Sequence, residues 1–154
     1  MHSSRNNIGA EIKGVACGAA YLIAAGAGDA TEIDGADINR TGFDSCQVIL
    51  AWKTTLTAAK TLSIAVELQE SDDGTTWDTA EALQASTVVA TGAVTDSVGE
   101  TLFNVDFAGR KKFIRFNFTP DLSHTSTDTA VVSLAAILGG ASVLPTDLTS
   151  SVAT

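Results

Sequence analysis

The sequence predicts an all-β protein, a β-sandwich with jelly-roll or Greek-key topology and extended N- and C-terminal arms. Short runs alternate apolar and polar residues with a period of two, most clearly over residues 62–68. Gly, Asp and Thr residues typical of turns separate these runs. Apolar residues make up 45% of the chain and aromatic residues only 6%, which indicates a core of small and β-branched side chains. A closed barrel is the alternative architecture.

The length of 154 residues suits one domain with a substantial core. We divide the chain into a polar arm at 1–7, a single β-sandwich domain at 8–140 and a polar tail at 141–154. No internal repeat or linker interrupts the domain. Because a core of small side chains needs extensive strand pairing or neighbouring subunits, we expect an oligomer with little helix.

The domain begins with a predicted strand at residues 8–17. Residues 19–23 are apolar and form either strand or loop. Residues 26–41 are rich in Gly and Asp, which predicts turns around a short extended piece at 32–38.

Residues 43–53 form the next predicted strand. Alternate positions place one apolar set on a single face: Cys46, Val48, Leu50 and Trp52. Ile49 and Ala51 make the opposite face semi-apolar, as expected of a strand that is covered on both sides.

A hairpin strand over residues 62–68 lies at the centre of the prediction. Turn residues follow at 71–74, and Trp77 comes next, where it can fold back over the strand. Asp78 and Glu81 have capping-box spacing, so residues 80–85 are predicted to form one or two helical turns.

The second half of the domain continues with shorter strands. Residues 87–91 and 101–107 are predicted strands, and residues 92–99 connect them. Ile114, Phe116 and Phe118 share one face of a strand at 112–119, which we expect Pro120 to end because proline has no N–H for the ladder. The last strand, 129–138, is almost wholly apolar, as is typical of a central strand.

The charge of −9 and the pI near 4.4 argue against a nucleic-acid partner, because phosphate-binding domains usually carry a basic face. Acidic residues gather between residues 29 and 44, and four of the nine basic residues are Arg110, Lys111, Lys112 and Arg115. These regions are either two solvated faces or complementary surfaces that dock between copies or onto a shell.

No residue pattern predicts an enzyme, a metal site or a cofactor. Cys17 and Cys46 lack the spacing of a zinc site and are expected to be buried, reduced thiols. His2 and His124 are isolated, and the Asp residues near position 34 do not match a calcium-binding loop. Asp72 and Asp73 resemble a turn more than a catalytic pair of carboxylates.

Two apolar stretches, 14–28 and 130–144, are too short or too interrupted by Gly to span a bilayer or to act as a secretion signal. We therefore expect no membrane partner. Trp52, Trp77 and Tyr21 could form a sugar-stacking platform, but their strand positions are more typical of core residues.

Three stretches together, 39–45, 68–77 and 112–119, resemble the small structural proteins of tailed-bacteriophage head modules, particularly capsid decoration (cement) proteins. The similarity extends over about residues 30–140. It implies a sandwich or jelly-roll subunit, often a homotrimer, that binds the major capsid protein on the outer capsid surface and bridges capsomers. The resemblance carries over no enzymatic residue.

We therefore expect a non-enzymatic virion structural protein, made in the host cytoplasm and located on the capsid surface. The alternative is a tail-associated module that binds carbohydrate or a receptor. The candidate partner contacts lie in the two arms and in the basic segment: Ile8, Arg110, Lys111, Lys112, Val143 and Leu144.

Overall fold

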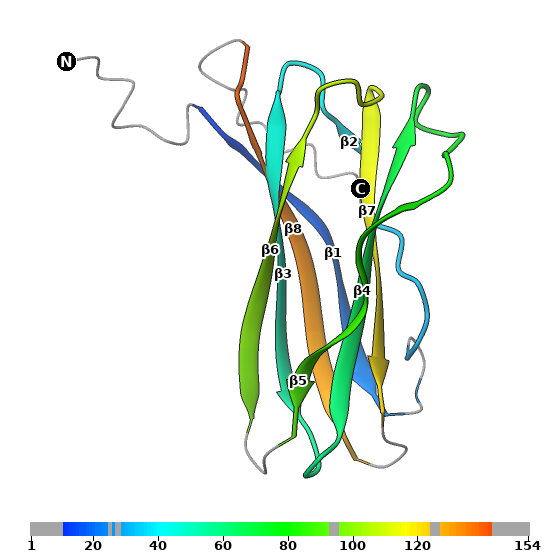
Figure 1. Ribbon diagram of the computed structural model, residues 1–154, viewed down its shortest axis with the longest axis vertical. Coiled ribbons are helices and arrows are strands. Elements are labelled where there is room, and N and C mark those ends of the chain that lie inside the picture. The colour runs from blue at the N-terminus through cyan, green and yellow to red at the C-terminus, as the bar shows by residue number, and fades with distance from the viewer. Residues whose placement is uncertain (1–10, 25, 27–28, 93–95, 124–126, 143–154) are drawn as a thin grey trace, which may run out of the picture.

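A computed structural model describes residues 11–24, 26, 29–92, 96–123 and 127–142. These residues form eight strands in two sheets that pack face to face, and they contain no helix (Figure 1). The strands are β1 (Lys13–Ile23), β2 (Ile38–Asn39), β3 (Ser45–Thr55), β4 (Thr61–Ser71), β5 (Glu81–Thr91), β6 (Ser97–Asp106), β7 (Phe113–Leu122) and β8 (Thr129–Gly139). The predicted arm at 1–7 and residues 143–154 of the predicted tail lie outside the described residues.

The strand order shows jelly-roll topology. One sheet has the order β1-β8-β3-β6 and the other has the order β2-β7-β4-β5. All the pairs are antiparallel, and β1 pairs with β8, β2 with β7, β3 with β6 and β4 with β5. The first strand therefore pairs with the last, the second with the second-last, and so on inward. This pairing is that of a jelly roll, in which one long antiparallel hairpin is rolled into two sheets. The predicted all-β sandwich is confirmed.

The core lies between the sheets, where alternate residues of each strand point inward. Ile64 and Val66 of β4 are fully buried, as are Val48 and Leu50 of β3. Phe116 of β7 packs in the same cluster. The period of two in the sequence therefore identified the inward faces of these strands correctly. The central position predicted for the last strand is also confirmed, because β8 lies between β1 and β3.

The helix predicted at residues 80–85 is wrong, because residues 81–85 belong to β5. The two residues of the expected capping box have other partners: Glu81 binds Arg110, and the Asp78 carboxylate binds Lys111. Gln84 donates a side-chain hydrogen bond to the Ile64 carbonyl at 2.9 Å. Pairing with β4 therefore replaces the few internal bonds that so short a helix could form.

The prediction that Pro120 ends its strand is also wrong, since β7 continues to Leu122. The Pro120 carbonyl accepts a hydrogen bond from the Ala30 N–H at 2.8 Å. In a strand the nitrogen and carbonyl of one residue point the same way, so the proline nitrogen points away from β4. The missing N–H therefore costs no bond in the ladder with β4.

The first strand is displaced along the chain from its predicted place. β1 covers residues 13–23, so the segment at 19–23 is strand, and a bulge lies between Ala16 and Gly18. β6 likewise begins at Ser97, within the predicted connection.

Tyr21 is 62% exposed, so the prediction that it is a core residue is wrong.

Candidate interaction site

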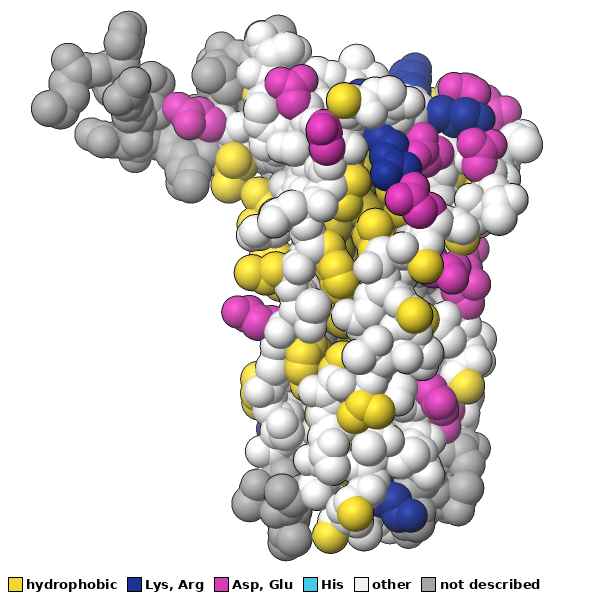
Figure 2. All heavy atoms as spheres, viewed as in Figure 1, with side chains coloured by type: hydrophobic (Ala, Val, Ile, Leu, Met, Phe, Trp, Pro, Cys, Tyr) yellow, Lys and Arg dark blue, Asp and Glu magenta, His cyan; other side chains and the backbone are white. Residues whose placement is uncertain are grey.

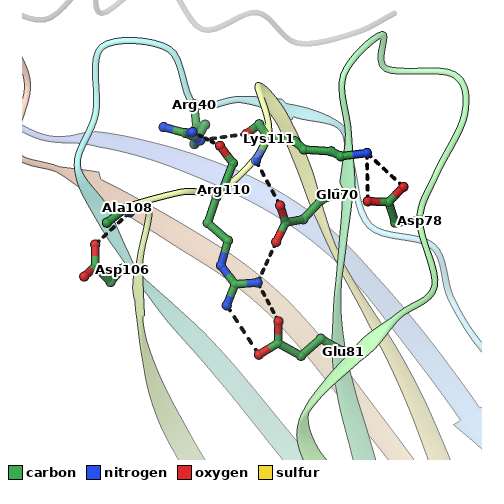
Figure 3. Close-up of polar contacts among 8 residues, drawn as sticks. All are labelled: Arg40, Glu70, Asp78, Glu81, Asp106, Ala108, Arg110 and Lys111. Atoms are coloured by element: carbon green, nitrogen blue, oxygen red, sulfur yellow. Dashed lines mark hydrogen bonds and ion pairs between the residues drawn. The ribbon is translucent and has the colours of Figure 1, made fainter.

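The basic segment of the sequence lies in the loop between β6 and β7, at one end of the sandwich. Phe107 is buried and fixes the start of the loop. The Arg110 N–H donates to the Phe107 carbonyl at 3.1 Å, which closes a turn. Gly109 has a φ of 75°, a left-handed conformation that glycine adopts without steric cost. The turn directs Arg110 back toward the second sheet (Figure 3).

Arg110 binds two carboxylates at once. Its Nη1 lies 2.5 Å from Glu70 Oε1 and 2.5 Å from Glu81 Oε2, and its Nη2 lies 3.3 Å from Glu81 Oε1. Hydrogen bonds from Arg110, together with its charge, hold the pKa of Glu81 below its ordinary value. The bonds to Glu81 and Glu70 raise the pKa of Arg110. Arg110 is thus paired inside its own chain.

Lys111 is paired in the same way. Its Nζ lies 2.9 Å from Asp78 Oδ2 and 3.1 Å from Asp72 Oδ2, and these contacts raise the pKa of the ammonium group. Its backbone N–H donates to Glu70 Oε2 at 2.9 Å. Lys112 differs, because it is exposed and its Nζ lies 5.0 Å from the centre of the Phe113 ring.

Arg40, from the segment after β2, joins the loop from the other side. Its Nε donates to the Lys111 carbonyl at 2.6 Å, and its Nη2 donates to the Arg110 carbonyl. Its guanidinium also lies 5.7 Å from the centre of the Phe107 ring. Arg40 therefore holds the loop backbone. The Arg110 side chain reaches Glu70 of β4 and Glu81 of β5, and the Lys111 side chain reaches the loop between these strands.

We call these residues the end cluster: Arg40, Glu70, Asp72, Asp78, Glu81, Arg110 and Lys111. It holds three cations and four carboxylates, so the segment that is basic in sequence is neutralised in space. Figure 2 shows basic and acidic side chains together at this upper end. Asp72 and Glu81 remain more than half exposed, at 77% and 56%. A partner that binds this end of the sandwich would therefore contact ion pairs and the exposed carboxylates of Asp72 and Glu81, and not a basic surface.

A second polar cluster, on the outer face of β7 and β4, was missed in the sequence. Asn117 is fully buried there. Its amide donates to Glu32 Oε1 at 2.7 Å and to Gln69 Oε1 at 3.0 Å, and its oxygen accepts from the Gly35 N–H at 3.1 Å. Asn117 therefore fixes the acidic segment before β2 across the sheet.

The neighbouring Arg115 completes this second cluster. Its Nη1 lies 3.3 Å from Asp34 Oδ2, and its guanidinium lies 4.5 Å from the centre of the Trp77 ring. Part of the acidic region thus meets a basic residue within one chain. Trp77 does fold back over the β4–β7 face, as the sequence predicted.

The three aromatic residues of the hypothetical sugar platform do not converge. Trp52 is 9% exposed and belongs to the core, Trp77 is covered by Arg115, and Tyr21 lies exposed on β1 in the other sheet. The residues that such a platform needs are therefore in three different environments.

Both cysteines are free thiols in the core. Burial, and secondarily the nearby Cys46 sulfur, raises the pKa of Cys17 to about 12. Burial alone raises the pKa of Cys46 to about 12. These thiols are inert packing residues at neutral pH.

Ile8, Val143 and Leu144, the candidate contacts in the arms, lie outside the described residues. Within the described part of the chain, no group of three or more His, Cys, Asp or Glu side chains is placed to hold a metal ion. Nor do the described residues contain a helix of the length and apolarity that a membrane crossing needs.

The fold defines this chain as an eight-stranded jelly-roll sandwich. Among solved structures, a chain of the infectious bursal disease virus Gx strain matches 87% of it at a TM-score of 0.50 and 14% identity, over 35% of the viral chain. A VP2 subviral particle of the same virus matches 84% at a TM-score of 0.49 and 11% identity, over 33% of that chain.

A Bacillus endospore appendage, described as a disulfide-linked pilus, matches 84% of this chain and 88% of its own at a TM-score of 0.35 and 14% identity. The chain spans about a third of the length of the viral chains, and the likeness to the Gx strain shows a shared fold. No protein-family model and no curated protein sequence matches the chain.

Proposed function

We propose that this chain is a non-enzymatic virion structural protein that binds the outer surface of a phage capsid and stabilises it by bridging capsomers. The observation that carries the proposal is the jelly-roll fold of this chain, which is similar to that of a chain of the infectious bursal disease virus Gx strain. Jelly rolls are typical of viral capsid domains. The resemblance to decoration proteins supplies the position on the outer surface.

The polar groups of the described residues support a structural role. The carboxylates of the end cluster bind cations of the same cluster, and Asn117 and Arg115 hold a segment of backbone in place. A shallow hollow of about 480 Å³ lies over β3, β6 and β8, and Asp106 is the one carboxylate among its lining residues. One Asp106 oxygen accepts the Ala108 N–H at 2.9 Å, as is typical of a turn.

The proposed contacts with the major capsid protein are the two arms and Lys112. Arg110 and Lys111 can contribute the exposed rim of the end cluster, but their charges are already paired. Exposed ion pairs each contribute at most about 1 kcal/mol and weaken with salt. Burial of Ile8, Val143 and Leu144 depends much less on salt. The arms are therefore the main source of affinity in this proposal.

The test is to strip the protein from particles and rebind it to empty shells over a salt series. We compare the full chain, a chain that lacks residues 1–7 and 141–154, and the Lys112→Ala variant. Lys53→Ala is the matched control, because Lys53 is an exposed lysine on another part of the sandwich. We expect arm deletion to weaken rebinding more than Lys112→Ala does. Undiminished rebinding of the chain without arms would contradict the proposed contacts, and no rebinding of the full chain would contradict the function.

A further inference from the structure

A sandwich has four edge strands, and three of them carry features that block the addition of another strand. β5 pairs irregularly with β4, with three register shifts along its length. β2 has only two residues. β1 has a bulge between Ala16 and Gly18, and the Cys17 carbonyl accepts a hydrogen bond from the Ala36 N–H at 2.9 Å. Bulges, short edges and covering segments are the usual protection against edge-to-edge pairing.

β6 is the fourth edge, and it is regular throughout. Each residue from Ser97 to Asp106 has a partner on β3, without a bulge, and this stretch contains no proline or lysine. Within the described residues, no strand pairs with its other side. In the part of the chain that the structure describes, β6 therefore presents a regular edge over its 10 residues that no other strand pairs.

The backbone direction of β6 identifies which groups face outward. The Phe107 N–H donates to the Asp44 carbonyl beside β3, so the Asp106 carbonyl, in the same peptide unit, points away from β3. Because the direction alternates along a strand, the even-numbered residues present both N–H and C=O to the free edge. They are Val98, Glu100, Leu102, Asn104 and Asp106.

The side chains of β6 leave apolar surface beside this edge. Val98 is 75% exposed and Leu102 is 49% exposed. Phe103, which points inward, is only partly buried against the core. Figure 2 shows hydrophobic side chains in a band between the β6 side and the β5 side of the molecule. The same edge thus combines unpaired backbone with exposed apolar side chains.

We propose that β6 pairs antiparallel with β6 of a second copy, about a twofold axis at Leu102, and joins two four-stranded sheets into one of eight strands. A twofold contact needs a strand that complements itself. In this register, Leu102 lies opposite Leu102 of the second copy, Glu100 lies opposite Asn104, and Val98 lies opposite Asp106. All five outward-facing residues form backbone bonds, and no two carboxylates lie opposite each other.

Neighbouring registers are worse. An axis at Phe103 places Glu100 opposite Asp106, and an axis at Thr101 places Asp106 opposite Asp96. An axis at Glu100 places Glu100 opposite itself. Like charges directly opposite each other destabilise a strand pair. On a chain of charge −9, this disfavours these three registers relative to the Leu102 register, which also pairs all five outward-facing residues of β6.

The contact is independent of the proposed function, because it can form whether or not the protein binds a capsid. It is also distinct from the expected homotrimer, since a threefold contact uses two different surfaces. Sedimentation velocity of the full chain over a concentration series tests the contact. We expect the wild type to dimerise and Leu102→Lys to raise the dissociation constant at least about tenfold, because two lysines then face each other without the leucine contact.

Val88→Lys is the matched control. Val88 is an apolar residue of an edge strand with similar exposure, 53%, but it lies on β5. We expect this variant to dimerise like the wild type. A wild type that stays monomeric, or an oligomer that Leu102→Lys leaves intact, would overturn the proposal.

Disulfide trapping tests the register without weakening the edge. Residues opposite each other in a hydrogen-bonded antiparallel pair have Cα atoms about 5.5 Å apart, within reach of a disulfide. We expect oxidised Leu102→Cys to form a covalent dimer, and Val98→Cys to remain largely uncrosslinked because it faces Asp106. Equal crosslinking of the two variants, or none by Leu102→Cys, would overturn the register.

Discussion

Glu70 on β4 holds Arg110, in the loop after β6, through an ion pair of 2.5 Å. Its second oxygen accepts the Lys111 N–H at 2.9 Å, so one carboxylate binds both a side chain and the backbone of the loop. β4 and β6 belong to different sheets, and the Glu70–Arg110 pair therefore ties the two sheets together at this end.

We expect Glu70→Ala to lower the free energy of unfolding by about 1–3 kcal/mol, because it leaves the Lys111 N–H without its acceptor and removes one partner of Arg110. Glu81→Ala is the control, since Glu81 is 56% exposed and binds no backbone. We expect it to cost at most about 1 kcal/mol. Urea denaturation measures both, and an equal effect of the two variants would contradict the role of Glu70.

Ionisation of the Asp73 carboxylate, in the turn after β4, makes the free energy of unfolding depend on pH in the acid range. The backbone N–H groups of Thr76 and Thr75, and then the Ser71 hydroxyl, donate to this carboxylate and hold its pKa well below the ordinary value. A lowered folded-state pKa stabilises the fold above the unfolded pKa of about 4, and this contribution is lost as the pH falls through the folded pKa. The pKa values of Glu81 and Asp96 are also lowered in the folded protein, so these two carboxylates likewise stabilise the fold above their unfolded pKa and lose this contribution in acid.

We therefore expect Asp73→Asn to fold at neutral pH, because its amide oxygen can accept the same N–H groups. Below about pH 4 its stability should fall less steeply than that of the wild type. Thermal melts over a pH series measure this difference. Identical acid profiles would show that Asp73 does not contribute to the acid sensitivity.

Gly35 allows the segment before β2 to lie against β7. A Cβ at this position would be 2.0 Å from the Phe116 carbonyl oxygen. We expect Gly35→Ala to destabilise the fold by about 1–3 kcal/mol, because the segment must move and loses its bond to Asn117. Gly14→Ala is the control, since a Cβ there has no neighbour within 4 Å. Its effect should stay within about 0.5 kcal/mol, and a comparable loss in both variants would refute the packing argument.

Cys17 and Cys46 should react with a thiol reagent only when the protein unfolds. Both are buried, and the pKa of each thiol is raised to about 12, so little thiolate is present at pH 8. We expect no rapid labelling in native buffer and two equivalents in denaturant. Rapid labelling of the native protein would mean that the core opens easily near these residues.

Features that depend on neighbours along the chain could be predicted from the sequence. The alternation over 62–68 and the apolar set Ile114, Phe116 and Phe118 identified the buried faces of β4 and β7. The helix at 80–85 and the strand end at Pro120 were wrong, because the deciding bonds come from Ile64 and Ala30, far away in the chain.

The same limit applies to the end cluster. The sequence showed three adjacent basic residues, but not that Glu70, 40 positions earlier, and Glu81, 29 positions earlier, meet Arg110. Nor did it show that Asn117 would be buried on an outer face, because only the fold brings Glu32 and Gly35 over it. A run of basic residues therefore predicts a partner surface only when it is known which acidic residues, distant in the sequence, pair with it in the fold.

The proposed virion role is tested most directly by the copy number of this protein in purified particles, measured by quantitative mass spectrometry against the major capsid protein. If the chain covers the outer surface and bridges capsomers, we expect hundreds of copies per particle, released from the shell without loss of the capsid itself. A handful of copies would indicate a tail component, and complete absence from purified particles would contradict a virion structural role.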